Sequence, residues 1–299
     1  MSTHAESVLI GLVGDGVLPS LTPPLHEREG DVQGLRYLYR PLDLPGIGLP
    51  ADAIGDVLLW SSRLGFNGLN VTHPCKQLVL EHLDEMSDDA RRLGAVNTVL
   101  IRDGRFIGHN TDFSGFSRAL ADGLPGAALD RVVQLGAGGA GSAVADALLT
   151  AGVRVFDLVD TDPGRCAERA EALGELFPQT RVTAHAAAEL PALLAEADGV
   201  VNCTPVGMAA HPGAPFDTGL LESRHWVADV VYRPLETQLV REARVAGCRV
   251  LDGGRMAVGQ AADAFRLFTG RDADAGRMRE HFLELIAAEE APATAGAGL

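Results

Sequence analysis

The sequence is poor in positive charge and in cysteine. It has 25 Lys and Arg against 40 Asp and Glu, a formal net charge of −15. Nucleic acids and anionic membranes both require a basic surface, so this deficit argues against either as a partner. The four cysteines are scattered without paired spacing, at Cys75, Cys166, Cys203 and Cys248. That distribution fits a reducing compartment and gives no zinc framework.

Long hydrophobic runs, a leader and internal repeats are also absent. No apolar run reaches about 18 residues, so no segment is expected to span a membrane. The N-terminal stretch MSTHAESVLI lacks the basic region and apolar core of a signal peptide. The nine histidines show no HExxH or other ligand spacing, so no metal is expected. We expect a cytoplasmic protein that is a monomer or a homodimer.

The first part of the chain alternates strand-like and helix-like segments. With 299 residues, of which 46% are hydrophobic, the chain is long enough for two domains. Asp103-Gly104 predicts the turn of a hairpin within 95–112. The periodicity further predicts strands at 7–15, 37–44 and 66–72 and helices at 51–65 and 74–86. This alternation is typical of an α/β unit.

A second α/β unit follows. A strand at 131–135 leads into GAGGAG at 136–141, a helix at 142–152 and a strand at 153–160. Three more strand-to-loop transitions and one amphipathic helix are expected, at 199–208, 226–232, 248–253 and 254–271. The tail from about Glu289 is small, polar and rich in Gly and Ala, which predicts disorder.

The glycine loop of this second unit matches the dinucleotide fingerprint. Gly136, Gly138 and Gly141 form G-x-G-x-x-G between a strand and a helix, and Asp160 ends the next strand. The first glycine permits a tight turn, the second lets backbone approach a pyrophosphate, and the third lets helix pack on strand. The helix N-terminus then holds the anion.

Asp160 favours NAD over NADP. A carboxylate at the end of this strand accepts hydrogen bonds from the ribose hydroxyls and repels a 2′-phosphate. An NADP site favours an arginine there, and Arg165 comes only after Asp160 and Asp162. Asp162 is interpreted equally well as a ribose contact or as a turn residue before Pro163. Arg165 either stacks on the adenine or is a solvated charge.

Lys76 stands in NVTHPCK (70–76), at the start of the expected helix 74–86. The helix dipole disfavours a cation there by about 0.3–1 kcal/mol when the site is exposed. A dehydrogenase acting on an alcohol needs a group that takes or gives the hydroxyl proton, and a positioned lysine can do this. The alternative is an ordinary surface lysine.

Seven motifs resemble the shikimate dehydrogenase family in order and spacing, from Leu9 to about Arg271. They are NVTHPCK, LGAVNTV (93–99), GHNTDFSGF (108–116), GAGGAG, NCTPVGM (202–208), DVVYRPLET (229–237) and GRMAVGQAADAF (254–265). The resemblance implies reversible oxidation of a ring hydroxyl on a cyclic hydroxy acid, the 3-hydroxyl of shikimate or quinate. It also implies a substrate domain, 1–115 with 255–299, and a Rossmann NAD-binding domain, 116–254, with a cleft between them.

The resemblance also assigns roles to individual residues. The proton-transfer pair falls on Lys76 and Asp112. Substrate contacts are implied at Ser20, Thr22, Thr72, Asn97, Tyr232 and Gln260. Cofactor contacts are implied at Gly136, Ala137, Gly138, Gly139, Ala140, Gly141, Asp160, Asp162, Arg165, Thr204, Val206, Met208, Val230 and Gly253. Structural alternatives stay open: Asn97 and Thr72 as turn caps, Ser20 and Thr22 as helix caps, and Gln260 as a solvated helix residue.

Two departures from the common family pattern bear on substrate and cofactor. Ser20-Leu21-Thr22 stands where Ser-x-Ser is common, and Asp160-Thr161-Asp162 stands where Asn-Arg-Thr is common. Both resemble the NAD-dependent quinate/shikimate dehydrogenase branch. The prediction is therefore an NAD-dependent quinate/shikimate dehydrogenase. The alternatives are an NADP-linked biosynthetic shikimate dehydrogenase, an aminoshikimate-type dehydrogenase and a non-catalytic dinucleotide sensor.

Overall fold

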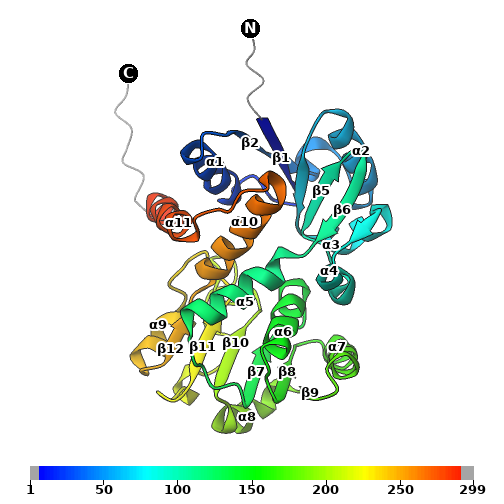
Figure 1. Cartoon of the computed structure of the whole chain (residues 1–299). Helices are drawn as coiled ribbons and strands as arrows, with labels where there is room; N and C mark the ends of the chain where they lie inside the picture. Colours follow the sequence, from blue (N-terminus) through cyan, green and yellow to red (C-terminus); the bar gives the residue numbers. More distant parts are fainter. Residues whose placement is uncertain (1–6, 291–299) are drawn as a thin grey trace.

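The computed structural model describes residues 7–290 and contains two six-stranded sheets, one above the other in Figure 1. The upper sheet is formed by the N-terminal strands and the lower one by the strands from residue 131 onward. Helices cover both sheets, so the predicted two-domain α/β fold is confirmed.

The first sheet is mixed, with the order β2-β1-β3-β5-β6-β4. Strand β1 pairs in parallel with β2 and β3, whereas β5 is antiparallel to both β3 and β6. The strands are β1 (Ser7–Gly14), β2 (Arg36–Asp43), β3 (Gly68–Val71), β4 (Glu85–Met86), β5 (Thr98–Arg102) and β6 (Arg105–His109). The accompanying helices are α1 (Thr22–Val32), α2 (Ile54–Arg63), α3 (Cys75–Leu78) and α4 (Asp88–Leu93).

The second sheet is parallel throughout, with the order β12-β11-β10-β7-β8-β9. This is the Rossmann order, whose direction reverses between the first strand, β7, and β10. The strands are β7 (Arg131–Leu135), β8 (Val155–Val159), β9 (Arg181–His185), β10 (Gly199–Asn202), β11 (Trp226–Asp229) and β12 (Arg249–Leu251). The helices are α6 (Gly139–Thr150), α7 (Pro163–Leu176), α8 (Leu190–Glu196) and α9 (Gln238–Val245).

Two helices join the sheets, α5 (Thr111–Gly123) and α10 (Gly253–Thr269), and they cross in the middle of Figure 1. Their backbones touch, because a Cβ on Gly115 would lie 2.6 Å from the Gln260 nitrogen. Helix α10 serves both cores: Phe265 packs with β1 and β2, and Met256 packs with the core of the second sheet. The predicted domain boundaries, 115/116 and 254/255, fall within these two helices and stay a prediction.

The hairpin within 95–112 is confirmed, with Asp103 and Gly104 both at positive φ in its turn. The helix predicted over 74–86 is wrong beyond its first turn. Helix α3 ends at Leu78, a 3-10 turn follows at Val79–His82, and β4 then pairs with β6. The apolar spacing of this segment is therefore carried by one helical turn and one 3-10 turn, and its last two residues pair with β6 as a strand.

The C-terminal helix α11 spans Ala275–Glu290, so the expected disordered tail does not begin at Glu289. The remainder of that tail, 291–299, lies outside the described residues. Within 7–290, no helix has the length and apolarity needed to cross a membrane. The same part of the chain holds no cluster of three His, Cys, Asp or Glu side chains suited to a metal ion.

Candidate active site

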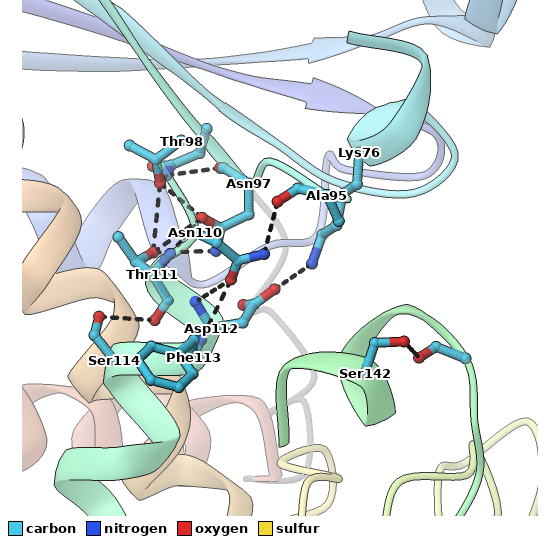
Figure 2. Close-up of polar contacts among 12 residues, drawn as sticks. Lys76, Ala95, Asn97, Thr98, Asn110, Thr111, Asp112, Phe113, Ser114 and Ser142 are labelled. Carbon is cyan, nitrogen blue, oxygen red and sulfur yellow. Dashed lines mark hydrogen bonds and ion pairs between the residues drawn. The ribbon is translucent and has the colours of Figure 1, made fainter. Parts of the chain in front are cut away.

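Lys76 and Asp112 meet between the two halves of the chain. Lys76 lies in α3, and Asp112 lies in the first turn of α5, 36 residues later. The Lys76 Nζ donates to Asp112 Oδ2 at 2.6 Å (Figure 2). The side chains are 23% and 12% exposed, so the pair is shielded but reachable. A lysine held in this way can exchange a proton with a ligand without losing its position.

Asn110 determines where the Asp112 carboxylate lies. It is the N-cap of α5, and its Oδ1 accepts from the amides of Asp112 and Phe113 at 3.1 and 3.3 Å. Its Nδ2 donates to the Ala95 carbonyl, which fixes the cap to the loop before β5. Asp112 therefore begins a helix whose start is anchored to the first sheet.

The structure does not support the helix-dipole penalty expected at Lys76. Helix α3 has four residues, too few for a developed dipole, and Lys76 lies in its only turn. The position of Lys76 follows instead from backbone bonds on either side. The Cys75 amide donates to the Thr72 carbonyl, and the Val96 amide donates to the Lys76 carbonyl, both at 2.8–2.9 Å. The junction between β3 and α3 thus directs the lysine at Asp112.

Asn97 is buried, at 4% exposure, beside this pair. Its Oδ1 accepts from the Thr111 amide at 2.8 Å and from the Thr98 hydroxyl at 3.0 Å. Its Nδ2 donates one hydrogen to the Thr111 hydroxyl at 3.0 Å (Figure 2). The amide is therefore fixed, and one N–H is left to donate to another acceptor. Asn97 therefore makes the kind of capping contact that the structural alternative expected, to the first amide of α5.

Sequence reasoning missed the polar chain behind Asn97. Asn70, in the middle of β3, accepts from the Tyr39 hydroxyl at 2.6 Å and donates to the Thr98 hydroxyl at 2.9 Å. Both Asn70 and Tyr39 are buried. An asparagine inside the apolar strand GLNV was the available signal, because a buried amide must find partners.

The segment after β1 carries the two candidate carboxylate-binding hydroxyls. Ser20 and Thr22 are both half-buried, and the Ser20 Oγ accepts from the Thr22 amide at 3.2 Å. Gly14 brings this segment against Thr72, since a Cβ there would lie 2.4 Å from the Thr72 methyl. The N-cap of α1 is Leu21, without a side-chain cap hydrogen bond, so neither hydroxyl is the helix cap that the structural alternative expected. The Ser20 contact is a local one, and its hydroxyl hydrogen is not used in it.

Gln260 and Tyr232 belong to α10 and to the loop after β11. The contact of Gly115 with Gln260 places the glutamine one turn along from Asp112. Tyr232 follows β11 and is 36% exposed. The protein around its phenol raises the Tyr232 pKa, Arg233 opposes this rise, and Asp112 reinforces it.

The glycine loop has the geometry that its motif requires. Gly136 has a φ of 99°, and a Cβ there would lie 2.8 Å from the Cys203 backbone. A Cβ on Gly141 would lie 2.2 Å from the Gly136 oxygen, so this position tolerates only glycine. Gly138 is the N-cap of α6 and opens onto free space. The loop, with Ala137, Gly139 and Ala140, forms an open cradle at a helix N-terminus suited to a pyrophosphate.

Asp160 is tied to this loop and to α7. Its carboxylate accepts from the Ala137 amide at 2.7 Å, the Asp162 amide at 2.9 Å and the Arg165 guanidinium at 2.5 Å. Burial raises its pKa, but these hydrogen bonds outweigh burial, so the pKa lies below its ordinary value. Asp162 is the N-cap of α7, and its carboxylate accepts from the Arg165 amide. This contact corresponds to the turn role that was one of the two interpretations of Asp162.

The remaining cofactor candidates line the same edge of the second sheet. Thr204, Val206 and Met208 follow β10, Val230 follows β11, and Gly253 follows β12. A Cβ on Gly253 would lie 2.6 Å from the Val230 carbonyl. All five therefore share the carboxyl edge at which open α/β sheets bind ligands.

Asn202 and Asp229, also missed from sequence, fix these loops. Asn202 Oδ1 accepts from the Thr204 hydroxyl at 2.6 Å, and its Nδ2 donates to Asp229 at 2.9 Å. Burial raises the pKa of Asp229 to about 6, against hydrogen bonds from Thr237, Val231 and Asn202.

An arginine ties the two clusters together. Arg92 of α4 donates twice to Asp146 of α6, both at 2.7 Å, and its guanidinium lies 5.3 Å from the centre of the Phe113 ring. Phe113 adjoins Asp112, and α6 starts at the glycine loop. Figure 2 shows the Lys76–Asp112 pair and Ser142 of α6 in one view. A Rossmann sheet with a fingerprint glycine loop has the geometry of a dinucleotide-binding enzyme, and the Lys76–Asp112 pair adds a group able to transfer a proton.

Comparison with known proteins identifies the family. Residues 12–99 match the shikimate dehydrogenase substrate binding domain, and residues 254–281 match the shikimate 5′-dehydrogenase C-terminal domain. The chain is 75% identical to a protein of Arthrobacter sp. (strain FB24) named shikimate dehydrogenase (NADP(+)), covering 98% of this chain and 100% of that one. It is 50% identical to quinate/shikimate dehydrogenase (NAD(+)) of Corynebacterium efficiens, covering 94% and 99%.

A solved structure agrees with these relatives. The quinate dehydrogenase of Corynebacterium glutamicum in complex with NAD superposes with a TM-score of 0.88 at 51% identity, covering 93% of this chain and 99% of that one. The chain belongs to the shikimate dehydrogenase family, and it is an oxidoreductase enzyme of that family. The resemblance drawn from the seven motifs is confirmed.

Proposed function

We propose that this enzyme reversibly oxidises the ring 3-hydroxyl of shikimate and quinate to the 3-dehydro acid, with NAD as the hydride acceptor. The observation that supports this proposal is the Lys76–Asp112 pair, 2.6 Å apart and partly shielded from solvent. Residues 1–115 and 255–299 form the substrate side in this proposal, and 116–254 the cofactor side.

The proposed acid–base work falls to Lys76. In the oxidation direction the ring hydroxyl proton moves to the Lys76 amine, and Asp112 stabilises the ammonium that forms. In the reduction direction the ammonium returns the proton to the carbonyl oxygen. Asp112 also accepts a hydrogen bond from a second ring hydroxyl, because its Oδ1 has no protein donor among the contacts described above.

Neutral polar groups hold the rest of the ring. The free N–H of Asn97 and the amide of Gln260 contact ring hydroxyls, together with Thr72 and Tyr232. Ser20 and Thr22 hold the carboxylate through their hydroxyls. A polyol acid needs several fixed donors and acceptors, and a site built to bond a hydroxyl strongly rejects an analogue that lacks it.

The residues present fit a nicotinamide dinucleotide. Gly138 and Gly139 leave open space at the start of α6 for a pyrophosphate, and Asp160 stands at the end of β8 for the ribose. When bound, the nicotinamide accepts a hydride from the ring carbon. Thr204, Val206, Met208, Val230 and Gly253 line the edge where the nicotinamide end lies in this proposal.

NADP is the second candidate cofactor, because the 75% identical relative carries NADP(+) in its name. Arg165 is the residue that could serve it. The guanidinium lies against Asp160 and is 49% exposed, so it can reach a 2′-phosphate only by giving up that ion pair. The buried carboxylate would remain beside the phosphate, and like charges repel, which favours NAD.

A spectroscopic assay tests the proposed function. Adding shikimate or quinate to the enzyme with NAD is expected to raise the NADH absorbance, and the Lys76→Met variant is expected to bind NAD without this rise. A wild-type protein that binds NAD but oxidises neither acid would instead support a dinucleotide sensor.

A further inference from the structure

Arg233 connects the cofactor side of the chain to the loop that carries Ser20. It lies after β11, directly beside Tyr232. Its Nη1 donates to the Pro19 carbonyl at 2.6 Å, and its Nη2 donates to Glu289 at 2.8 Å. Pro19 immediately precedes Ser20. One guanidinium therefore holds the backbone at the start of the candidate carboxylate-binding segment from 214 residues away.

Glu289 gives Arg233 a fixed partner. Helix α11, which carries Glu289, is clamped to α1 because Arg277 donates twice to the buried Glu29, at 2.9 and 2.6 Å. Arg279 also binds the Asp252 carboxylate at the N-cap of α10, at 2.8 and 2.9 Å. Helix α11 is thus held near its start to α1 and to the N-cap of α10, and its Glu289 carboxylate accepts from the Arg233 guanidinium near its other end.

Arg233 also lies beside a candidate substrate residue and a cavity. It directly follows Tyr232, whose pKa is raised by burial and lowered by the Arg233 charge. A cavity of about 480 Å³ borders Arg233, Glu289 and the cofactor candidate Met208. Lys76 is paired with Asp112 and Arg233 with Glu289, whereas Ser20 and Thr22 offer neutral hydroxyls. The special feature of Arg233 is that its guanidinium donates directly to the backbone carbonyl that precedes Ser20.

We infer that Arg233 is a positioning residue for the carboxylate of the substrate. By holding the Pro19 carbonyl, it places the Ser20 and Thr22 hydroxyls that would receive the carboxylate. This inference rests on the proposed function. It makes recognition of the acid group depend on a residue from the cofactor side, so acid binding requires the two halves to be in the arrangement seen here.

The test uses Arg233→Met, which keeps the length of the side chain and removes its donors and charge. We expect the KM for shikimate or quinate to rise about tenfold, equivalent to about 1.4 kcal/mol. The kcat and the KM for NAD are expected to stay within about twofold. Arg233→Lys, which keeps the charge and one donor at a time, is expected to recover part of the loss. Thermal unfolding of each variant checks that it is folded.

Two controls separate this role from a general effect on the cleft. Arg241→Met changes an arginine that borders the same cavity but donates to the Glu236 carbonyl, and its KM values are expected to match wild type. The second control is the inhibition constant of a ring triol that lacks the carboxylate, which Arg233→Met is expected to leave unchanged.

The outcomes decide between this inference and its rivals. A wild-type KM for the acid in Arg233→Met, or equal weakening of the acid and the carboxylate-free triol, would overturn it and leave the proposed function standing. A wild-type enzyme that oxidises neither acid would remove the proposed function and this inference together.

Discussion

Two of the aspartate–cation pairs, one among the substrate candidates and one among the cofactor candidates, differ in how they are built. Lys76–Asp112 and Arg165–Asp160 are 2.6 and 2.5 Å apart, and both carboxylates are largely shielded, at 12% and 5% exposure. The cations differ: Lys76 is 23% exposed and Arg165 is 49% exposed. The first pair joins α3 to α5 inside a hydrogen-bonded network, whereas the second joins the residue after β8 to the exposed first turn of α7.

From this difference we expect the two pairs to have different roles, proton transfer for the first and cofactor selection for the second. A proton-transfer pair must keep its geometry through turnover, and Asn110, Thr111 and Asn97 provide that constraint around Asp112. A pair that selects between two ligands can exchange one partner for another, and Arg165 can turn into solvent while Asp160 keeps its bonds to the Ala137 and Asp162 amides. We therefore expect damage to the first pair to reduce turnover and damage to the second to change cofactor choice.

The largest effect is expected from Lys76→Ala. Losing a general acid–base group should lower kcat by about 100-fold or more. The dissociation constant for NAD, measured by fluorescence titration, should stay within about twofold because Lys76 belongs to the substrate side. Near-normal turnover in this variant would remove the acid–base role from Lys76.

Asp160→Ala should change the preference between NAD and NADP. Removing the carboxylate takes away a ribose acceptor and the repulsion of a 2′-phosphate, and it frees Arg165. We expect the ratio of kcat/KM for NAD over NADP to fall by about tenfold, roughly 1.4 kcal/mol. Asp162→Ala, which removes only the α7 cap, serves as the matched control. A wild type that prefers NADP would contradict the role given to Asp160 and would make Arg165 the selecting residue.

Asn110→Ala tests whether the first pair depends on its network. The loss of an N-cap typically costs about 1 kcal/mol of stability, and Asp112 should become less well placed. We expect a fall in kcat of about fivefold, with little change in the KM for NAD, by steady-state kinetics. Ser87→Ala removes the equivalent cap of α4 and should lower stability alone. Equal kcat in both variants would show that the cap does not position Asp112.

The smallest effect is expected at the carboxylate end. Quinate has a saturated ring and an extra hydroxyl beside the carboxylate, and Thr22 is the residue best placed to distinguish it. Thr22→Ser should shift the preference between quinate and shikimate by a few-fold, about 1 kcal/mol, the size of one ordinary net hydrogen bond. The kcat/KM for each acid in wild type and variant measures this shift. An unchanged ratio would assign the discrimination to another residue.

The parts of the fold that could be predicted are those fixed by local pattern. The glycine loop followed from Gly136, Gly138 and Gly141 between a strand and a helix, because each position has a steric reason visible in the motif. The hairpin turn followed from Asp103-Gly104 for the same reason. The helix over 74–86 failed because its apolar spacing is also compatible with one helical turn followed by a strand, and only pairing with β6 decides between them.

The parts of the site that escaped prediction depend on distant partners. Motif positions suggested Lys76 and Asp112, but nothing local indicates that Asn70 bonds to Tyr39, 31 residues away. Arg233 and Pro19 are 214 residues apart. The first contact arises from the strand order of one sheet and the second from loops that follow strands of different sheets, and sequence periodicity encodes neither.

The measurement that tests the central claim most directly is steady-state kinetics of the wild-type enzyme over shikimate and quinate, each with NAD and NADP. The account predicts that both acids are oxidised with NAD and that NADP gives a clearly lower kcat/KM with each. Oxidation of shikimate alone, with NADP preferred, would contradict the account and describe an NADP-linked shikimate dehydrogenase.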